Sequence, residues 1–385
     1  MTSEERKEAR YRRRIESRQR KKSARMRLAD NYDTVFSYAN LYQSYRQCRK
    51  NVSWKASVQR YITQAPLNLL HTHNRLMAGK YKSPGFFEFD LYERGKLRHI
   101  RSTVIDERVV QRCLCDNALV PVLTSTFIHD NGASMQGKGY DFAIRRLCQH
   151  LHEHYRKYGQ EGYILLFDFS KFFDNVSHAL VKGILRKHFT DERILAITEH
   201  FVDAFGDTGL GLGSQISQVL ALASANRLDH FAKEVLRIRG YGRYMDDGYL
   251  IHHDKEYLHH CARHIRAICD ELGITLNTRK TQVVKLSHGF TWLKVRFFLT
   301  PTGKVVKKIY PRSVTKMRRK LKAFRQKVVD GEMTLIDVYG SWQSWRAYAQ
   351  RFDSYHTVQR MAELYDRLFT CKEVYHGLYQ DPVFG

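Results

Sequence analysis

The segment Arg-Tyr-Met-Asp-Asp-Gly-Tyr-Leu-Ile-His, residues 243–252, places two adjacent carboxylates, Asp246 and Asp247, between two short apolar runs. Residues 243–245 and 248–252 have the length and composition of β-strands, so the segment predicts a hairpin with both acids at its tip. Two carboxylates beside buried strands repel each other unless a cation balances them. Asp is also a common turn residue, so the pair alone does not separate a metal site from an ordinary turn.

A third acid follows another strand-like run earlier in the chain. Asp168 comes directly after Tyr-Ile-Leu-Leu-Phe, residues 163–167, a run too short for a helix and long enough for a buried strand. Two Mg²⁺ ions would remove the repulsion among the three carboxylates and supply phosphoryl-transfer chemistry, because hard cations prefer oxygen ligands. We therefore predict that Asp168, Asp246 and Asp247 are catalytic and bind Mg²⁺.

The remaining periodicity predicts a second hairpin and many helices. Residues 86–90 and 96–104 alternate between apolar and polar side chains, which indicates a hairpin. Asp254 and Ser313 are placed to cap helices, and the second of these helices is basic with one apolar stripe. Three- and four-residue apolar spacing predicts further helical segments at 32–80, 106–119, 140–158, 177–188, 191–205 and 216–237.

The composition indicates a polyanionic partner. With 65 Lys and Arg against 39 Asp and Glu, the formal net charge is +26, and each phosphate that is neutralised releases condensed counterions. Nucleic acid fits this excess better than a membrane surface, because no basic amphipathic helix with an aromatic face stands out. No apolar run approaches the roughly 20 residues that span a bilayer. The seven cysteines are scattered without a CxxC pair, so we expect no disulfide framework, no zinc knuckle and a cytoplasmic location.

Residues 1–30 form a basic arm with twelve Lys or Arg against five acids. The arm lacks the apolar periodicity that would bury one face, so we expect it to be disordered or to become helical only on RNA. We predict that it binds RNA, and a solvated tail that only promotes solubility is the alternative.

Several motifs resemble those of reverse transcriptases in order and spacing over residues 35–350. Tyr244-Met245-Asp246-Asp247 is similar to their YxDD motif, and Phe-Asp-Phe-Ser-Lys-Phe-Phe-Asp at 167–174 to their first palm motif. Gly-Leu-Gly-Leu-Gly-Ser-Gln-Ile-Ser-Gln at 209–218 resembles the loop that meets template and nucleotide. Residues 96–98 with 106–111 are similar to the fingers segment of bacterial, group II intron-related enzymes. Residues 273–277 with Lys280 resemble the motif that follows the catalytic hairpin, and Trp292 with Leu293 resembles the primer grip.

This resemblance implies an α+β fold, a right-hand polymerase whose fingers and palm pack antiparallel sheet on helices and whose thumb is helical. The implied division is a basic arm at 1–30, fingers with N-terminal helices at 31–160, palm at 161–300 and thumb at 301–385. The implied activity is that of an RNA-directed DNA polymerase, a nucleotidyltransferase that uses two Mg²⁺ and dNTPs. Its partners would be a structured non-coding or template RNA and the cDNA product, with an accessory protein or a homo-oligomer left open.

The resemblance also implies roles for single residues. Phe173 lies five residues after Asp168, where a bulky ring would clash with a ribose 2′-hydroxyl and favour deoxynucleotides; simple core packing is the alternative. Lys96, Arg98 and Arg101 would meet the triphosphate, unless they only form a solvated hairpin face. The other implied contacts are Phe169 with metal and nucleotide, Gly213 with the nascent base pair, Gln218 with the template, and Lys280 with the departing pyrophosphate.

Two departures keep alternatives open. Ser217-Gln218 is similar to diversity-generating retroelement enzymes and to bacterial enzymes linked to antiphage defence, and the chain does not separate these roles. Lys294 stands where Gly is usual in the primer grip, so the path of the primer is open. A non-catalytic RNA-binding protein would explain the charge without needing three acids, and an RNA-dependent RNA polymerase would usually carry a polar or acidic group instead of Phe173.

Other conspicuous residues have simpler interpretations. The adjacent pairs His252-His253 and His259-His260 point to different faces and make poor shared zinc ligands. Trp342 and Trp345 lie at helical spacing and are predicted to belong to the core of the basic C-terminal helices.

Overall fold

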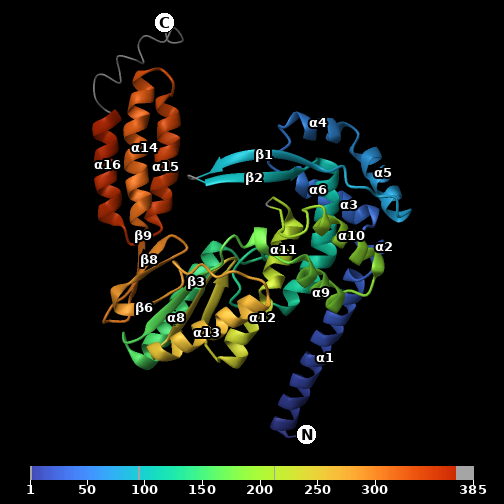
Figure 1. The fold of residues 1–385 in the computed structure, drawn as a ribbon, viewed down its shortest axis with the longest axis horizontal. Helices are drawn as coiled ribbons and strands as arrows, with labels where there is room; N and C mark the ends of the chain where they lie inside the picture. Colours follow the sequence, from blue (N-terminus) through green and yellow to red (C-terminus); the bar gives the residue numbers. More distant parts are fainter. Residues whose placement is uncertain (1, 94–95, 212, 370–385) are drawn as a thin grey trace. The chain divides into compact units, whose positions relative to one another are not determined.

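A computed structural model describes residues 2–93, 96–211 and 213–369, and the chain divides into two compact units. Unit 1 comprises residues 1–146, 167–249 and 259–281, and unit 2 comprises residues 147–166, 250–258 and 282–385. The described residues form helices and three sheets, and each sheet contains antiparallel strand pairs. This mixture confirms the predicted α+β class. Four elements pass from one unit to the other: α8 (Tyr140–Tyr158), β3 (Tyr163–Asp168), β5 (Asp247–His252) and α13 (Lys255–Glu271) (Figure 1).

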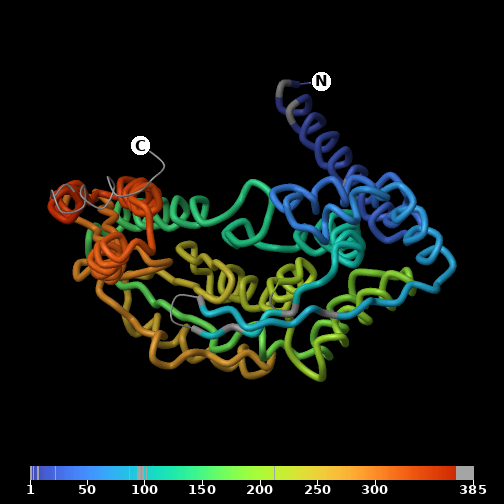
Figure 2. The backbone as a smooth tube through the Cα atoms, turned by 90° about the horizontal axis from the view of Figure 1, so that it is seen from above, coloured from blue at the N-terminus to red at the C-terminus, as the bar shows by residue number. Residues whose placement is uncertain are grey.

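Unit 1 begins with a long helix where the sequence predicted a disordered arm. A capping box opens α1 (Ser3–Ala29): the Thr2 hydroxyl accepts from the Glu5 amide, and the Glu5 carboxylate accepts from the Thr2 amide. An ion pair of Arg12 with Glu8, one turn apart, adds to the helix. In both backbone views, the N-terminal part of α1 extends away from the other helices of its unit (Figure 1, Figure 2). The prediction was wrong because local capping and ion pairs form a helix that needs no buried face.

The next helices of unit 1 pack around one buried helix and carry a hairpin. The inner face of α6 (Ile105–Leu114) is fully buried, and the Cys113 thiol donates to the Val35 carbonyl. The predicted hairpin is confirmed, with β1 (Phe86–Glu93) antiparallel to β2 (Lys96–Thr103). The other elements of this part are α2 (Tyr32–Val35), α3 (Tyr38–Cys48), α4 (Ala56–Thr63), α5 (Ala65–Met77), η1 (Cys115–Leu119), α7 (Val120–Leu123) and η2 (Thr124–Thr126).

A four-stranded sheet of order β4-β5-β3-β6 carries the acids that the sequence singled out. β3 ends at Asp168, and only Met245 and Asp246 separate β4 (Gly240–Tyr244) from β5. Both strand predictions are therefore confirmed. Within unit 2, β6 (Gln282–Lys285) pairs antiparallel with β3 from Tyr163↔Lys285 to Leu166↔Gln282.

The helix predicted at 216–237 is not continuous. It divides into α11 (Gln215–Ser224), α12 (Asn226–His230) and the π-turn η4 (Phe231–Val235). The Asn226 amide donates to the Thr126 carbonyl, and the His230 ring bonds to the same oxygen, so tertiary hydrogen bonds hold the break. The helices predicted at 177–188 and 191–205 are confirmed as α9 (His178–His188) and α10 (Glu192–Asp203), which follow the short 3-10 helix η3 (Phe173–Asn175).

Unit 2 contains a small sheet followed by a three-helix bundle. The sheet is the antiparallel meander β7 (Phe290–Trp292), β8 (Val295–Leu299) and β9 (Val305–Ile309), preceded by η5 (Leu286–His288). The bundle consists of α14 (Pro311–Val329), α15 (Leu335–Gln350) and α16 (Tyr355–Phe369) (Figure 1). Its core holds Met317, Leu321 and Trp342, with Trp345 packed against them, which confirms the predicted stripe and tryptophan core.

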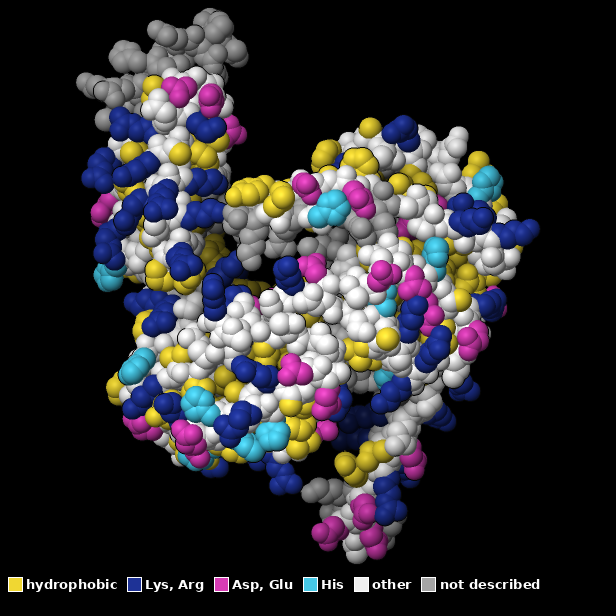
Figure 3. Space-filling view, viewed as in Figure 1, with side chains coloured by type: hydrophobic (Ala, Val, Ile, Leu, Met, Phe, Trp, Pro, Cys, Tyr) yellow, Lys and Arg dark blue, Asp and Glu magenta, His cyan; other side chains and the backbone are white. Residues whose placement is uncertain are grey.

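Ser313 does not cap α14, although the sequence suggested this role. The helix begins at Pro311, whose fixed φ suits the first turn, and the Ser313 hydroxyl accepts a hydrogen bond from the Trp345 indole instead. Asp254 does cap α13, since its carboxylate accepts from the amides of Glu256 and Tyr257. α14 carries eight Lys or Arg and no acid, and Figure 3 shows Lys and Arg side chains gathered over the bundle. No helix in the described part of the chain has the length and apolar character needed to cross a membrane.

Candidate active site

The three predicted acids meet within unit 1 because two chain reversals bring their strand ends together. Asp168 is the last residue of β3, Asp247 is the first residue of β5, and Asp246 lies in the turn before it. The Phe169 amide donates to the Asp246 carbonyl over 3.1 Å, which joins the end of β3 to the turn. Met245 has φ +55°, a left-handed backbone conformation that non-glycine residues adopt with strain.

Asp168 is held on both sides of its carboxylate. Lys280 Nζ lies 2.6 Å from Oδ2, and the Asn277 side-chain amide donates to Oδ1 over 3.2 Å. The Asn277 backbone amide also donates to the Asp168 carbonyl over 2.8 Å. From the sequence, Lys280 was predicted to meet the pyrophosphate, and Asn277 was given no role. The position of Asn277 directly after the short run 274–276 was the feature that could have indicated its role.

Burial and mutual repulsion shape the electrostatics of this site. Burial raises the pKa of Asp246, and the charge of Asp168 adds to this effect. Burial and the charges of Asp246 and Asp168 raise the pKa of Asp247 to about 7. Burial opposes the charge of Lys280, but its hydrogen bond to Asp168 and the nearby carboxylates outweigh burial and raise its pKa. The single ammonium of Lys280 therefore leaves the three carboxylates with an excess of negative charge.

The chemistry of this donor set fits a divalent cation. Carboxylate oxygens are the ligands that Mg²⁺ prefers, and the excess negative charge favours a cation. The arrangement is not preformed, however. Lys280 occupies Oδ2 of Asp168, and the described residues contain no group of three or more His, Cys, Asp or Glu side chains arranged to hold a metal ion.

The predicted nucleotide contacts near the first palm motif have clear places in unit 1. Gly213 has φ +106°, which a side chain would make costly, and it directly precedes the Ser214 cap of α11. Gln218 is exposed on α11 and accepts from the Ser134 hydroxyl over 3.2 Å. The ring of Phe169 is buried, whereas Phe173 is half-buried, with its ring edge-on to Phe172 at 5.8 Å. Phe173 is therefore accessible in a way that a core residue would not be.

The other predicted contacts stay predictions. Lys96, Arg98 and Arg101 belong to β2, but their side chains lie outside what the structure describes. Trp292 is buried at the end of β7 in unit 2, and Leu293 and Lys294 form a left-handed turn with φ +46° and +61°. This turn explains how Lys294 is accommodated where Gly is usual, because its backbone adopts the conformation that glycine favours.

A chain of polar side chains that the sequence did not predict connects the segment before the β1–β2 hairpin to the cap of α11. The Ser83 hydroxyl contacts the Glu107 carboxylate, which accepts from Gln111 Nε2 over 2.7 Å. Ser214 Oγ donates to Gln111 Oε1 over 3.0 Å. Burial raises the pKa of Glu107. Four side chains thus join the segment before β1, helix α6 and the cap of α11 inside unit 1.

The family of the chain follows from residues 82–297, more than half of its length, which match the reverse transcriptase (RNA-dependent DNA polymerase) family. No curated protein matches the chain. Among solved structures, it is similar to telomerase from Candida albicans in complex with a TWJ fragment of telomeric RNA, with a TM-score of 0.47 and 13% identity over 73% of this chain and 55% of that one.

A second similar structure is apo telomerase from Candida tropicalis, truncated from its C-terminal domain, with a TM-score of 0.44 and 12% identity over 63% of this chain and 60% of that one. The chain thus spans little more than half the length of either structure. The family match includes Asp168, Asp246, Asp247, Lys280 and Trp292. With the family match, the motifs and the acids at adjoining strand ends all in agreement, the chain belongs to the reverse transcriptase family.

Proposed function

We propose that this chain is an RNA-directed DNA polymerase that extends a primer with dNTPs on an RNA template. The convergence of Asp168, Asp246 and Asp247 at adjoining strand ends, with Lys280 beside them, is the observation that carries the proposal. A protein that only bound RNA would not need to collect one buried and two half-buried carboxylates against their mutual repulsion. The net charge of +26 supports a nucleic-acid partner but does not distinguish these two functions.

Each residue of the site has a task in this reaction. Asp168, Asp246, Asp247 and the Phe169 backbone would hold two Mg²⁺ ions. When bound, these ions activate the primer 3′-hydroxyl and stabilise the pyrophosphate that leaves. Asn277 fixes the orientation of Asp168, since it donates to this residue from both its side chain and its backbone.

Lys280 and Phe173 would act on the incoming nucleotide. The raised pKa of Lys280 keeps its ammonium charged, so this side chain would meet the departing pyrophosphate as a charged hydrogen-bond donor and balance its negative charge. The half-buried Phe173 ring would exclude a ribose 2′-hydroxyl. Lys96, Arg98 and Arg101 of β2 would meet the triphosphate, Gly213 the nascent base pair, Gln218 the template, and Trp292 with Leu293 the primer.

The wider setting of the enzyme is also part of the proposal. Motif similarity favours a bacterial retroelement or antiphage-defence enzyme with a dedicated structured RNA, fingers at 31–160, palm at 161–300 and thumb at 301–385. A template repeat beside a variable-protein gene would favour the retroelement, and protection of cells against phage would favour defence. A cytoplasmic location and an accessory protein or homo-oligomer belong to the same proposal.

Primer extension by the purified protein on an RNA template tests the activity. The assay compares dNTPs with NTPs in Mg²⁺ and includes the variant Asp246→Asn/Asp247→Asn. Asp254→Asn is the matched control, because it makes the same chemical change at an exposed helix cap that Asn also satisfies.

Extension with dNTPs by the wild type and by Asp254→Asn, but not by the double variant, would support the polymerase. RNA binding without extension, even after co-purified RNA is returned, would favour the non-catalytic RNA-binding protein. A preference for NTPs would contradict the role given to Phe173 and favour an RNA-dependent RNA polymerase.

A further inference from the structure

A fully buried arginine stands two residues before the catalytic turn. Arg243 on β4 and Asp229 on α12 are both 0% exposed, and they form an ion pair of 2.6 Å. Burying two charges costs free energy that their attraction recovers only when the geometry is good and the remaining donors find partners. Pairs of this kind are often no more stable than apolar side chains of the same size. Stability alone therefore does not explain why a charged pair lies beneath the turn.

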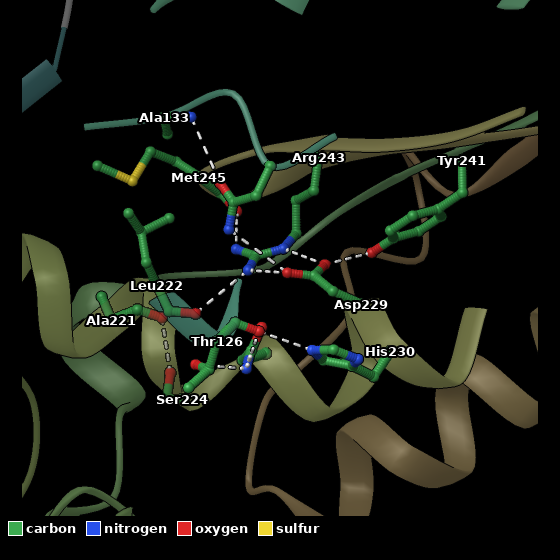
Figure 4. A network of polar contacts seen from close by, with 12 residues as sticks. Thr126, Ala133, Ala221, Leu222, Ser224, Asp229, His230, Tyr241, Arg243 and Met245 are labelled. Carbon is green, nitrogen blue, oxygen red and sulfur yellow. Dashed lines mark hydrogen bonds and ion pairs between the residues drawn. The ribbon is translucent and has the colours of Figure 1, made fainter. Parts of the chain in front are cut away.

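A network of hydrogen bonds surrounds the pair, as Figure 4 shows. Arg243 Nε donates to Asp229 Oδ1 over 2.7 Å and Nη2 donates to Oδ2 over 2.6 Å. The guanidinium therefore binds the carboxylate in a bidentate arrangement. The Tyr241 hydroxyl donates to the same Oδ1 over 2.6 Å, and the Asn131 side chain donates to Oδ2 over 3.4 Å. Asp229 thereby fixes the plane of the guanidinium.

The remaining guanidinium donors reach the backbone at two functional places. Arg243 Nη1 donates to the Met245 carbonyl over 2.8 Å, and Nη2 donates to the Leu222 carbonyl over 3.2 Å (Figure 4). Met245 is the strained residue of the catalytic turn, with φ +55°. Leu222 lies on α11, the helix that begins directly after Gly213. One side chain thus connects the turn before Asp246 to the helix of the nucleotide loop.

The backbone of Arg243 is fixed as well. Its amide donates to the Asp130 carbonyl over 3.1 Å, and its carbonyl accepts from the Gly132 amide over 2.9 Å. The guanidinium therefore extends from a strand that is held on both sides, and its position does not depend on the turn. A left-handed non-glycine residue is strained and persists only when its surroundings determine its conformation. The bond from Nη1 supplies that constraint at the Met245 peptide.

We propose that Arg243 is a positioning residue which, oriented by Asp229 and Tyr241, fixes the Met245 peptide and thereby the carboxylates of Asp246 and Asp247. This inference rests on the proposed polymerase function only for its kinetic consequence. The structural part concerns the turn itself and is measurable in the protein without substrate.

The decisive variant replaces the network by apolar side chains: Arg243→Met/Asp229→Leu/Tyr241→Phe. It removes the bond to Met245 and leaves neither a lone buried charge nor a Tyr241 hydroxyl without its acceptor, so it can fold with little loss of stability. Arg243→Lys is the conservative variant, because it keeps the charge opposite Asp229 while a single amine cannot form the fork and the separate bond to Met245 together. Arg193→Met is the control, since it breaks another fork, Arg193 with Asp33, at an exposed position.

Three quantities are measured: thermal melting, amide hydrogen exchange of residues 244–248, and the kinetics of primer extension. For the triple variant we expect a cooperative melt, faster exchange in the turn but not in the α14–α16 bundle, and kcat at least about tenfold lower with KM for dNTP within about twofold. Arg243→Lys changes in the same direction, and Arg193→Met leaves turn exchange and kcat unchanged.

A triple variant that melts normally and keeps both turn protection and kcat would overturn the inference. If the triple variant does not melt cooperatively, Arg243→Lys decides by the same criteria. If the wild type itself does not extend a primer, the proposed function fails, and unchanged turn exchange in the variants would then reject the positioning role separately.

Discussion

At the level of single residues, two side chains besides the three acids shape the site, because Asn277 orients Asp168 and Arg243 holds the peptide before Asp246. Asp168, Asp246 and Asp247 stand out because each follows a short apolar run, and a strand end is where a buried sheet can expose a carboxylate. Asn277 and Arg243 do not stand out, because nothing in a linear chain shows that one donates to Asp168 and the other to Met245. Such contacts depend on which elements meet in three dimensions.

Asp247 should weaken the fold when it is ionised without a metal. Its pKa rises from 3.8 in the unfolded chain to about 7 in the folded protein, so the folded state binds the proton more tightly. Stability is therefore lost as pH rises from about 4 to 7 and stays lost above that range, by an amount on the order of a few kcal/mol. In EDTA at pH 8, Asp247→Asn should melt at a higher temperature than wild type, and the gap should shrink at pH 5.

Adding Mg²⁺ at pH 8 should reverse this order, because the ion stabilises the wild-type site by mass action and binds the variant more weakly. Melting curves with EDTA and with Mg²⁺ at both pH values measure the effect. An equal gap at pH 5 and pH 8 would show that Asp247 does not carry the raised pKa.

At the level of elements, the sequence predicts the strands and the long helices and misplaces their interruptions. The hairpin of β1 with β2 and the helix α8 follow from periodicity alone. The break between α11 and α12 does not, because bonds from Asn226 and His230 to distant Thr126 hold it. In the same way, nothing in the sequence shows that the charged residue Glu107 is fully buried and bonded to Ser83 and Gln111.

Glu107→Gln tests the buried chain from Ser83 to Ser214. Because burial raises the pKa of Glu107 above 4.5, the folded protein loses stability as pH rises through and above that value. Gln keeps the shape and the hydrogen-bonding capacity and does not ionise, so the melting temperature of the variant minus that of the wild type should increase from pH 5 to pH 8. Glu107→Ala, which leaves Ser83 and Gln111 without their acceptor, should lower the melting temperature at both pH values. A difference for Glu107→Gln that does not change with pH would contradict the buried-acid interpretation.

At the level of the whole molecule, composition predicts the class of partner but not where the partner binds. The net charge of +26 indicates a nucleic-acid partner. The structure adds that helix α14 carries eight Lys or Arg residues and no Asp or Glu. The α+β class and the family were predictable because the motifs keep their order along the chain. The helical state of residues 3–29 was not, because it depends on caps and ion pairs and not on a buried face.

Removing charge from α14 should weaken binding in a salt-dependent way. Arg318→Gln/Arg319→Gln/Lys322→Gln, three exposed positions, should lower the slope of log K against log salt for an RNA–DNA duplex by roughly 2 to 3, because each phosphate contact contributes about 0.7–0.9. The charge-matched control is Lys255→Gln/Arg263→Gln/Arg266→Gln on α13. Binding of the two variants and the wild type, measured over roughly a sixfold range of KCl concentration, decides between these assignments. An equal change in both variants would assign the affinity to overall charge instead of the bundle.

The carboxylates, Lys280 and the buried arginine all belong to unit 1, whereas the acid-free helix α14 belongs to unit 2. In the proposed polymerase, the residues that would set the rate of each addition and the basic helix that would hold the template are encoded in separate stretches of the gene. Selection could then lengthen or shorten the cDNA through substitutions in the bundle while the catalytic residues stay as they are. An engineer could exploit the same separation and exchange the bundle to change processivity alone.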